Sequence, residues 1–264
     1  MDVGRTGALQ PGQLAAVIPA RNEARSIRAL AQACLQYVQH VIVIDDASTD
    51  GTAEALTGLP VTVLSNKTRL GKGGALSRGF KEALEYGAGA IITLDGDGQH
   101  DPHDIPAFVE AANRYPGYLI IGARIKGAAH APRSRRAANR IADFWISWAA
   151  GEPIRDSQSG HRLYPRELLM SVHANARVAD GFAFESEMLI ESTRHGFRIA
   201  AVPIEARYPG GARTSYFRPA YDIWRITRMV SWKLASRAMF LPGLARALLS
   251  QPLIATHRIS SDHR

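Results

Sequence analysis

The chain has 264 residues, of which 46% are hydrophobic and 21% charged, and it carries a formal net charge of +8. This length can bury a large core, and the ordinary composition indicates a globular protein of one domain, with or without an appendage. The single cysteine, Cys34, excludes an internal disulfide and a thiolate metal cluster. Because neither a signal-peptide pattern nor an apolar stretch of about 18 residues is found, we expect a cytoplasmic protein.

Apolar runs and helical patterns alternate through the first half of the chain. We predict strands at 13–20, 40–48, 60–66, 89–97 and 117–124, and helices at 23–36, 51–57, 73–86 and 104–114. This alternation is typical of an α/β fold with a mostly parallel sheet and helices on both faces. Beyond it we predict helices at 134–150 and 184–195, a strand at 197–206 and a long basic helix from residue 219.

Each of the first five predicted strands ends in polar or small residues. These ends lie at 21–23, 45–46, 65–66, 95–97 and 123–124. The carboxyl ends of parallel strands share one edge of a sheet, and open α/β sheets bind their ligands at that edge. We therefore expect the functional site there.

The segment LDGDGQHD, at the end of the fourth predicted strand, has the residues of a metal site. Asp95 and Asp97 form a D-x-D pattern, whose carboxylates project to the same side of an extended backbone and can reach one divalent cation. Hard oxygen ligands favour Mg²⁺ or Mn²⁺, and Gln99 offers a further, neutral oxygen. The competing interpretation is helix capping, which suits Asp101 and Asp104 best.

Two further segments indicate nucleotide binding. GKGGAL places glycines around Lys72 just before a predicted helix, where backbone amides and an ammonium can meet a phosphate. The Walker A spacing is absent, and a simple turn before a helix is an equally good interpretation. In DDASTDGT, Asp45 or Asp46 is a candidate for a base or ribose contact, whereas Ser48 and Asp50 are typical helix caps.

Four of these segments, VIPARNEA, VIVIDDASTDGT, GKGGAL and LDGDGQHDP, occur in an order and spacing that resembles family 2 glycosyltransferases of the GT-A fold. The later segments GAR, DSQSGHRLYP, FESEMLIESTRHGFRI and VPIEARY resemble the dolichyl- or polyprenyl-phosphate sugar synthase branch. The resemblance spans roughly residues 13–220 and implies a GT-A-type, Rossmann-like sheet. We expect an N-terminal tail at 1–12, the glycosyltransferase domain at 13–218 and a basic amphipathic helical extension at 219–264.

The resemblance also implies roles for individual residues. The nucleotide-sugar would be bound by Pro19, Arg21, Glu23, Asp46, Lys72 and Asp95. The metal, Mg²⁺ or Mn²⁺, would be held by Asp95, Asp97 and Gln99. The acceptor would be bound by Arg124, Arg135, Gln158 and Ser215. The chain departs from the branch where YPGGARTSYFRP replaces the usual acceptor loop, which leaves the acceptor's identity open.

The chemistry of the family is inverting transfer of a sugar from a nucleotide-linked donor, here UDP- or GDP-linked. A metal at Asp97 would stabilise the departing nucleoside diphosphate. A phosphate acceptor, of which polyprenyl phosphate is the expected one, is anionic at pH 7 and needs positioning, for which Arg124 is the candidate. A hydroxyl acceptor on a lipid or glycan needs a general base instead, and Glu185 is the candidate for that role.

Two functions of other classes compete with sugar transfer. A sugar-phosphate nucleotidyltransferase should carry a G-x-G-T-R-type signature at the first strand, where this chain has PARNEA. A non-enzymatic nucleic-acid-binding module would suit the basic charge. However, carboxylates at the strand ends would repel phosphates in the absence of a metal, so we expect no nucleic-acid partner.

Residues 219–241 form a predicted basic amphipathic helix. A helical wheel groups Ile223, Trp224, Val230, Leu234, Ala235 and Ala238 on an apolar face. The opposite face carries Asp222, Arg225, Arg228, Lys233 and Arg237, and Trp232, Met239 and Phe240 lie near it. Such a helix suits contact with anionic lipid, so we expect peripheral attachment to the cytoplasmic face of a membrane, where a lipid acceptor would enter. The alternative is packing against the catalytic domain or a second subunit.

Overall fold

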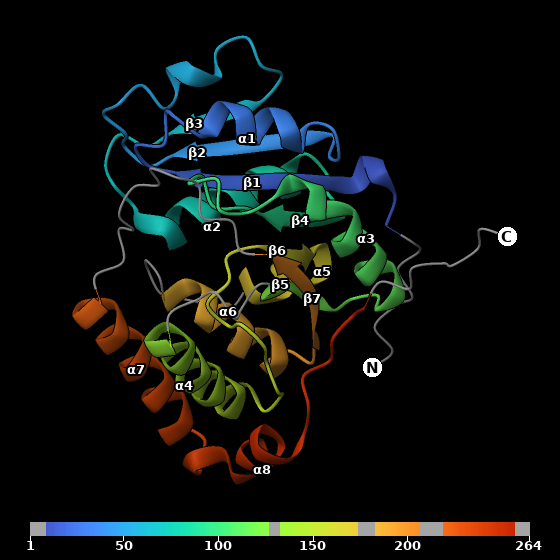
Figure 1. Ribbon diagram of the computed structural model, residues 1–264, viewed down its shortest axis with the longest axis vertical. Coiled ribbons are helices and arrows are strands. Elements are labelled where there is room, and N and C mark those ends of the chain that lie inside the picture. The colour runs from blue at the N-terminus through green and yellow to red at the C-terminus, as the bar shows by residue number, and fades with distance from the viewer. Residues whose placement is uncertain (1–8, 127–132, 174–182, 206–218, 257–264) are drawn as a thin grey trace, which may run out of the picture.

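A central sheet with helices on both faces organises the protein (Figure 1). The computed structural model describes residues 9–126, 133–173, 183–205 and 219–256. Within them the strands follow the order β3-β2-β1-β4-β6-β5-β7. Their bounds are β1 Leu14–Ala20, β2 His40–Asp45, β3 Thr62–Ser65, β4 Ala90–Thr93, β5 Leu119–Lys126, β6 Arg162–Pro165 and β7 Ile199–Glu205. Only β6 runs antiparallel to its neighbours, β4 and β5, so the predicted mostly parallel α/β sheet is confirmed.

The helices divide between the two faces of the sheet. Their bounds are α1 Ile27–Cys34, α2 Gly71–Glu85, α3 Ile105–Arg114, α4 Arg133–Ala150, α5 Arg166–His173, α6 Ala183–Arg194, α7 Pro219–Ala235 and α8 Leu241–Leu249. Successive residues of a strand point to opposite faces. Accordingly, Ala15 and Val17 of β1 pack in one core with α2, whereas Ala16 and Ile18 pack in the other core with α1 and α3.

Helix α2 lies unusually close to the sheet, and this fixes the position of its first turn. A Cβ on Gly79 would lie 2.4 Å from Val17 Cγ1 and 2.6 Å from Ile44 Cδ1, so only glycine permits this approach. The first turn of α2, which contains Lys72, is thereby held at the edge where β1 and β2 end.

The structure corrects several details of the predicted elements. The glycines around Lys72 do not form a loop, because α2 already begins at Gly71. The predicted helix at 51–57 is reduced to a single 3-10 turn, Glu54–Leu56. Strand β4 ends at Thr93, so Asp95 and Asp97 lie in the turn after it. Strand β6 and helices α5 and α8 were not predicted from the sequence.

Helix α7 packs on the protein, which was the alternative to lipid contact, and it does so through part of the predicted apolar face and one residue of the polar face. Helix α7 begins at Pro219 as predicted, contacts α4 and α6, and ends at Ala235. Among residues 224–235 of α7, those that are buried are Val230, Leu234 and Lys233, although the sequence placed Lys233 on the polar face. The reason is that Glu187 of α6 lies 2.8 Å from Lys233 Nζ, and Glu191 pairs with the same ammonium. A buried ammonium is tolerated when carboxylates neutralise it.

The opposite face of α7 carries two exposed tryptophans. Trp224 is 54% exposed and Trp232 73% exposed, although the sequence grouped Trp224 with the buried Val230. The Arg228 guanidinium lies over the Trp224 ring, 4.8 Å from its centroid. Helix α8 follows after a short kink and packs against α4, at the end of the molecule away from α1 and β3 (Figure 1). Among the described helices, none is both long and apolar enough to cross a bilayer.

Candidate active site

The ends of β1 and β2 are tied together by hydrogen bonds between the loops that follow them. Asn22 donates its N–H to Ser48 Oγ at 2.8 Å and accepts at Oδ1 from the Thr49 N–H at 2.8 Å. Glu23 donates its N–H to Thr52 Oγ1 at 2.9 Å. The predicted nucleotide-binding residues 19–23 therefore lie at the expected edge, beside the segment that follows β2.

Asp46 is occupied in a structural role at this edge. Its carboxylate accepts from the N–H groups of Leu70 and Gly71, at 2.7 and 2.8 Å, and from Asn66 Nδ2 at 2.9 Å. These bonds satisfy amides at the N-terminus of α2, where a carboxylate also interacts favourably with the helix dipole. Asp46 thus anchors α2 to the end of β2, and its predicted contact with a nucleotide stays a prediction.

The centre of the site is an ionic cluster built from three elements distant in sequence. Lys72 Nζ, from the first turn of α2, lies 2.5 Å from Asp95 Oδ1 and 3.1 Å from Glu185 Oε1 of α6. Burial alone would raise the pKa of Asp95, but the charge and the hydrogen bond of the Lys72 ammonium outweigh burial and lower that pKa to about 2. The Asp95 carboxylate is therefore ionised near neutral pH.

Asp97 differs from Asp95 in its electrostatic surroundings. Burial, followed by the negative charge of Asp95, raises the pKa of Asp97 above its ordinary value. Its Oδ1 accepts the N–H of Gln99 at 3.0 Å, which orients the carboxylate within the turn. The two carboxylates repel one another, and a cation between them would relieve the repulsion.

These residues fit a divalent metal. Asp95 and Asp97 supply hard carboxylate oxygens from one turn, and Mg²⁺ or Mn²⁺ is commonly held by one or two carboxylates plus substrate phosphates and water. No group of three or more His, Cys, Asp or Glu within the described ranges could form a closed metal site. His100 Nδ1 accepts the Asp95 N–H at 3.0 Å, so this nitrogen supports the turn. Gln99 as a ligand stays a prediction.

Arg124 is fixed next to the cluster by Asp156, a residue that the sequence did not single out. Its Nε donates to Asp156 Oδ2 at 2.7 Å and its Nη2 to Oδ1 at 2.6 Å, and the Arg124 N–H also donates to Oδ2 at 2.8 Å. Asp143 of α4 in turn accepts the N–H groups of Asp156 and Ser157. This chain of contacts gives the guanidinium a defined orientation, and 28% of the Arg124 side chain stays exposed.

Arg162 stabilises the segment between α4 and β6 through hydrogen bonds. The sequence did not single out this residue either. It is fully buried, and its guanidinium donates to the carbonyls of Ser159 at 2.8 Å, Glu185 at 2.6 Å and Ser157 at 2.8 Å. The segment DSQSG and the first turn of α6 are thereby joined. The sequence offered one signal, an arginine beside the apolar residues of HRLYP.

Of the predicted acceptor-binding residues, the structure describes the side chains of some and not of others. Gln158 lies in the segment held by Arg162, and its Nε2 donates to Ser157 Oγ and Ser186 Oγ, both at 3.4 Å. The backbone of Arg135 belongs to α4, but its side chain lies outside the described part of the structure, and so does Ser215. Glu185, the candidate base, is 6% exposed and engaged by Lys72.

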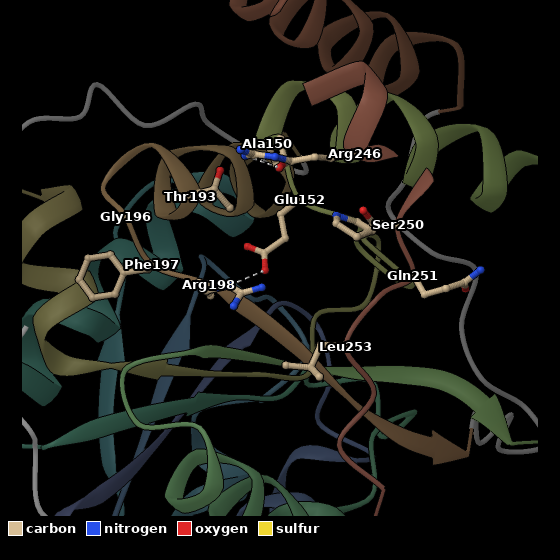
Figure 2. A pocket seen from close by; sticks show the side chains of 12 residues that line it. Ala150, Glu152, Thr193, Gly196, Phe197, Arg198, Arg246, Ser250, Gln251 and Leu253 are labelled. Carbon is tan, nitrogen blue, oxygen red and sulfur yellow. Dashed lines mark hydrogen bonds and ion pairs between the residues drawn. The ribbon is translucent and has the colours of Figure 1, made fainter. Parts of the chain in front are cut away.

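A separate pocket of about 520 Å³ lies at the opposite edge of the sheet, where β7 begins (Figure 2). The C-terminal ends of α4, α6 and α8 surround it. Glu152 pairs there with Arg198 at 3.3 Å, and Arg246 donates to the Gly151 carbonyl at 3.3 Å. None of the predicted site residues lines this pocket, so the carboxyl edge with Asp95 and Asp97 is the better candidate site.

Comparisons with known proteins bear on this site. Residues 15–174 match the family described as Glycosyl transferase family 2. The chain is 31% identical over 207 residues to an undecaprenyl-phosphate mannosyltransferase of Micrococcus luteus, a match that covers 75% of this chain and 83% of the relative. It is 28% identical to a polyprenol monophosphomannose synthase of Mycolicibacterium smegmatis, over 71% of this chain and 75% of the relative.

A solved structure is similar over most of the chain. Glucosyl-3-phosphoglycerate synthase from Mycobacterium tuberculosis, in complex with Mg²⁺ and uridine diphosphate, superposes with a TM-score of 0.60 at 25% identity. The similarity covers 86% of this chain and 79% of that one. The same protein has been crystallised with Mn²⁺, uridine diphosphate and phosphoglyceric acid.

Proposed function

The chain is a GT-A-fold member of glycosyl transferase family 2, and from this premise we propose that it transfers a sugar, with inversion, from a nucleoside-diphosphate sugar to polyprenyl phosphate. One observation carries the proposal. The paired carboxylates Asp95 and Asp97 lie at the carboxyl edge of the sheet beside Arg124, whose guanidinium Asp156 orients. In this proposal a divalent cation and an anionic acceptor would bind next to one another.

On the donor side, the carboxylates and the first turn of α2 act together. Asp95 and Asp97 would hold Mg²⁺ or Mn²⁺, which supplies Lewis-acid stabilisation of the leaving diphosphate. Pro19, Arg21 and Glu23 belong to the segment at the same edge and would contact the nucleotide. The relative crystallised with uridine diphosphate and a divalent ion supports this assignment of the edge.

On the acceptor side, the state of Glu185 supports a phosphate. A hydroxyl acceptor needs a general base, and a base works best when its carboxylate is free to take a proton. Glu185 is buried, and its Oε1 lies 3.1 Å from the Lys72 ammonium, so this carboxylate already has an ion-pair partner and is not free to act on an acceptor. A phosphate needs no base, only a cation to position it, and Arg124 is suitably placed to do so.

The undecaprenyl-phosphate mannosyltransferase and the polyprenol monophosphomannose synthase support a lipid acceptor for this chain. An enzyme with a lipid acceptor would benefit from contact with the membrane that holds the lipid. The outward face of α7 suits such contact because Trp224 and Trp232 are exposed there and Arg228 accompanies them. Tryptophan favours the membrane interface, and arginine is attracted to anionic headgroups. The enzyme would then act at the cytoplasmic face of the membrane as a peripheral protein.

The test is a transfer assay in which UDP- and GDP-sugars are crossed with polyprenyl phosphate, polyprenol and 3-phosphoglycerate in the presence of Mn²⁺. We expect transfer to polyprenyl phosphate, and loss of at least about 100-fold in Asp97→Asn. Asp101→Asn is the matched control, because Asp101 caps the neighbouring turn by accepting the N–H of His103. Transfer only to polyprenol or 3-phosphoglycerate, or undiminished metal-dependent transfer by Asp97→Asn, would contradict the proposal.

A further inference from the structure

Lys72 neutralises the carboxylate that a divalent cation would need. Its Nζ lies 2.5 Å from Asp95 Oδ1, a full ion-pair contact. A Cβ on Gly160 would lie 2.8 Å from both Lys72 Nζ and Asp95 Oδ2, so the absence of a side chain at this position leaves room for the pair. An ammonium and a metal ion bound to the same carboxylate would repel one another, so the two cations compete for Asp95.

The charges of the cluster suit a divalent ion. With all groups ionised, Asp95, Asp97 and Glu185 carry three negative charges and Lys72 one positive charge, which leaves an excess of two negative charges. The neighbouring guanidinium of Arg124 does not change this excess, because Asp156 pairs with it. Buried charge is costly unless it is compensated, and one divalent cation compensates this excess completely.

Glu185 gives Lys72 a second partner within reach. Its Oε1 lies 3.1 Å from Lys72 Nζ, and only 16% of the Lys72 side chain is exposed. If Asp95 bound a metal ion and Glu185 were absent, the nearly buried ammonium of Lys72 would have no carboxylate to compensate its charge. With Glu185 present, a small movement of the side chain keeps the ammonium paired.

We propose that Lys72 is an exchangeable counterion, which neutralises Asp95 in the metal-free protein and moves to Glu185 when Asp95 takes up the divalent cation. Lys72 and Glu185 are therefore positioning residues that set the affinity for the metal. This inference depends on the proposed function only for the metal site at Asp95 and Asp97. It assigns Glu185 a role that requires no proton transfer.

The experiment measures Mn²⁺ binding to the full chain without donor, by the electron paramagnetic resonance signal of free Mn²⁺. Lys72→Gln should tighten binding at least about tenfold, because it removes the competing charge. Lys81→Gln is the matched control, since Lys81 lies on the same helix with a 78% exposed side chain, and it should bind like the wild type. Glu185→Gln should weaken binding about tenfold, because Lys72 then loses the carboxylate to which it would move.

A double-mutant cycle separates exchange from a simple effect of nearby charge. If Glu185 acts through Lys72, Glu185→Gln should change the affinity less than about twofold in the Lys72→Gln background. Independent effects on the metal would instead add, and additivity would overturn the inference. If Lys72→Gln does not fold, Glu185→Gln tests the inference by itself. A Mn²⁺ affinity equal to that of the wild type in Glu185→Gln would overturn counterion exchange.

The outcomes distinguish this inference from the proposed function. Unchanged or weaker binding in Lys72→Gln, with binding still abolished by Asp97→Asn, refutes counterion exchange and leaves the transferase site intact. If Mn²⁺ does not bind to the wild type even with uridine diphosphate present, both the metal site and the exchange are refuted.

Discussion

Replacing Arg162 by methionine should destabilise the protein by about 3 kcal/mol. Its guanidinium donates to three backbone carbonyls at 2.6–2.8 Å from a fully buried position. Hydrogen bonds from a charged group contribute about 1.5–3 kcal/mol each, or roughly 4.5–9 kcal/mol for three. The desolvation of a buried charge, which methionine avoids, offsets several kcal/mol of that gain. The net loss is a large part of the typical stability of about 5–15 kcal/mol.

Urea unfolding followed by circular dichroism measures this loss. With a slope of about 3 kcal/mol per molar urea for a chain of this size, the midpoint should fall by about 1 M. Arg166→Met is the matched control, because Arg166 lies at the start of α5 and its Nη1 donates to the carbonyls of Leu84 and Ala88 at 3.1 Å from a partly exposed position. The control should lose less stability than Arg162→Met, because it has two bonds instead of three and water can replace these partly exposed bonds. An equal loss in both variants would refute the role assigned to the three buried bonds.

Two further predictions concern lipid and acceptor binding. Trp224→Ser combined with Trp232→Ser should lower partitioning onto anionic vesicles about tenfold, measured by co-sedimentation. Met170→Ser, which alters an exposed residue on α5, is the control and should leave partitioning unchanged. Unchanged partitioning of the tryptophan double variant would show that the outward face of α7 does not contact lipid. Asp156→Asn should raise the KM for the phosphate acceptor about tenfold, and Arg124→Gln should do the same, because Asp156 orients the guanidinium. Weakened donor binding with an unchanged acceptor KM would contradict that assignment.

Much of the fold follows from local patterns that the sequence displays directly. Apolar runs bounded by polar residues predicted β1 to β5 and β7, because a strand covered on both faces needs apolar side chains throughout its length. Because β1 to β5 run in the same direction, their carboxyl ends lie at one edge, so Asp95, Asp97 and Arg124 could be expected at one site without coordinates. The order of the motifs identified the family, and the match at 15–174 confirms it.

Strand β6 shows where local patterns fail. It begins with the fully buried Arg162 and ends at Pro165, so its composition does not predict a strand. Its place between β4 and β5 depends on pairing with residues far away in the sequence. Because the site segment 156–161 precedes β6 directly, the role of Asp156 also stayed hidden.

The faces of α7 and the centre of the site were decided by tertiary structure. A helical wheel assumes that lysine faces water, but Glu187 and Glu191 of α6 supply the charge that lets Lys233 be buried. Trp224, which the wheel placed on the apolar face, is exposed instead. Likewise, the sequence suggested a phosphate-binding role for Lys72 but could not show that Asp95 and Glu185 surround it. The sequence determined which charged groups exist and at which strand ends they lie. Only the packing of distant elements decided how those charges pair, because the pairing energy depends on distance and burial in space.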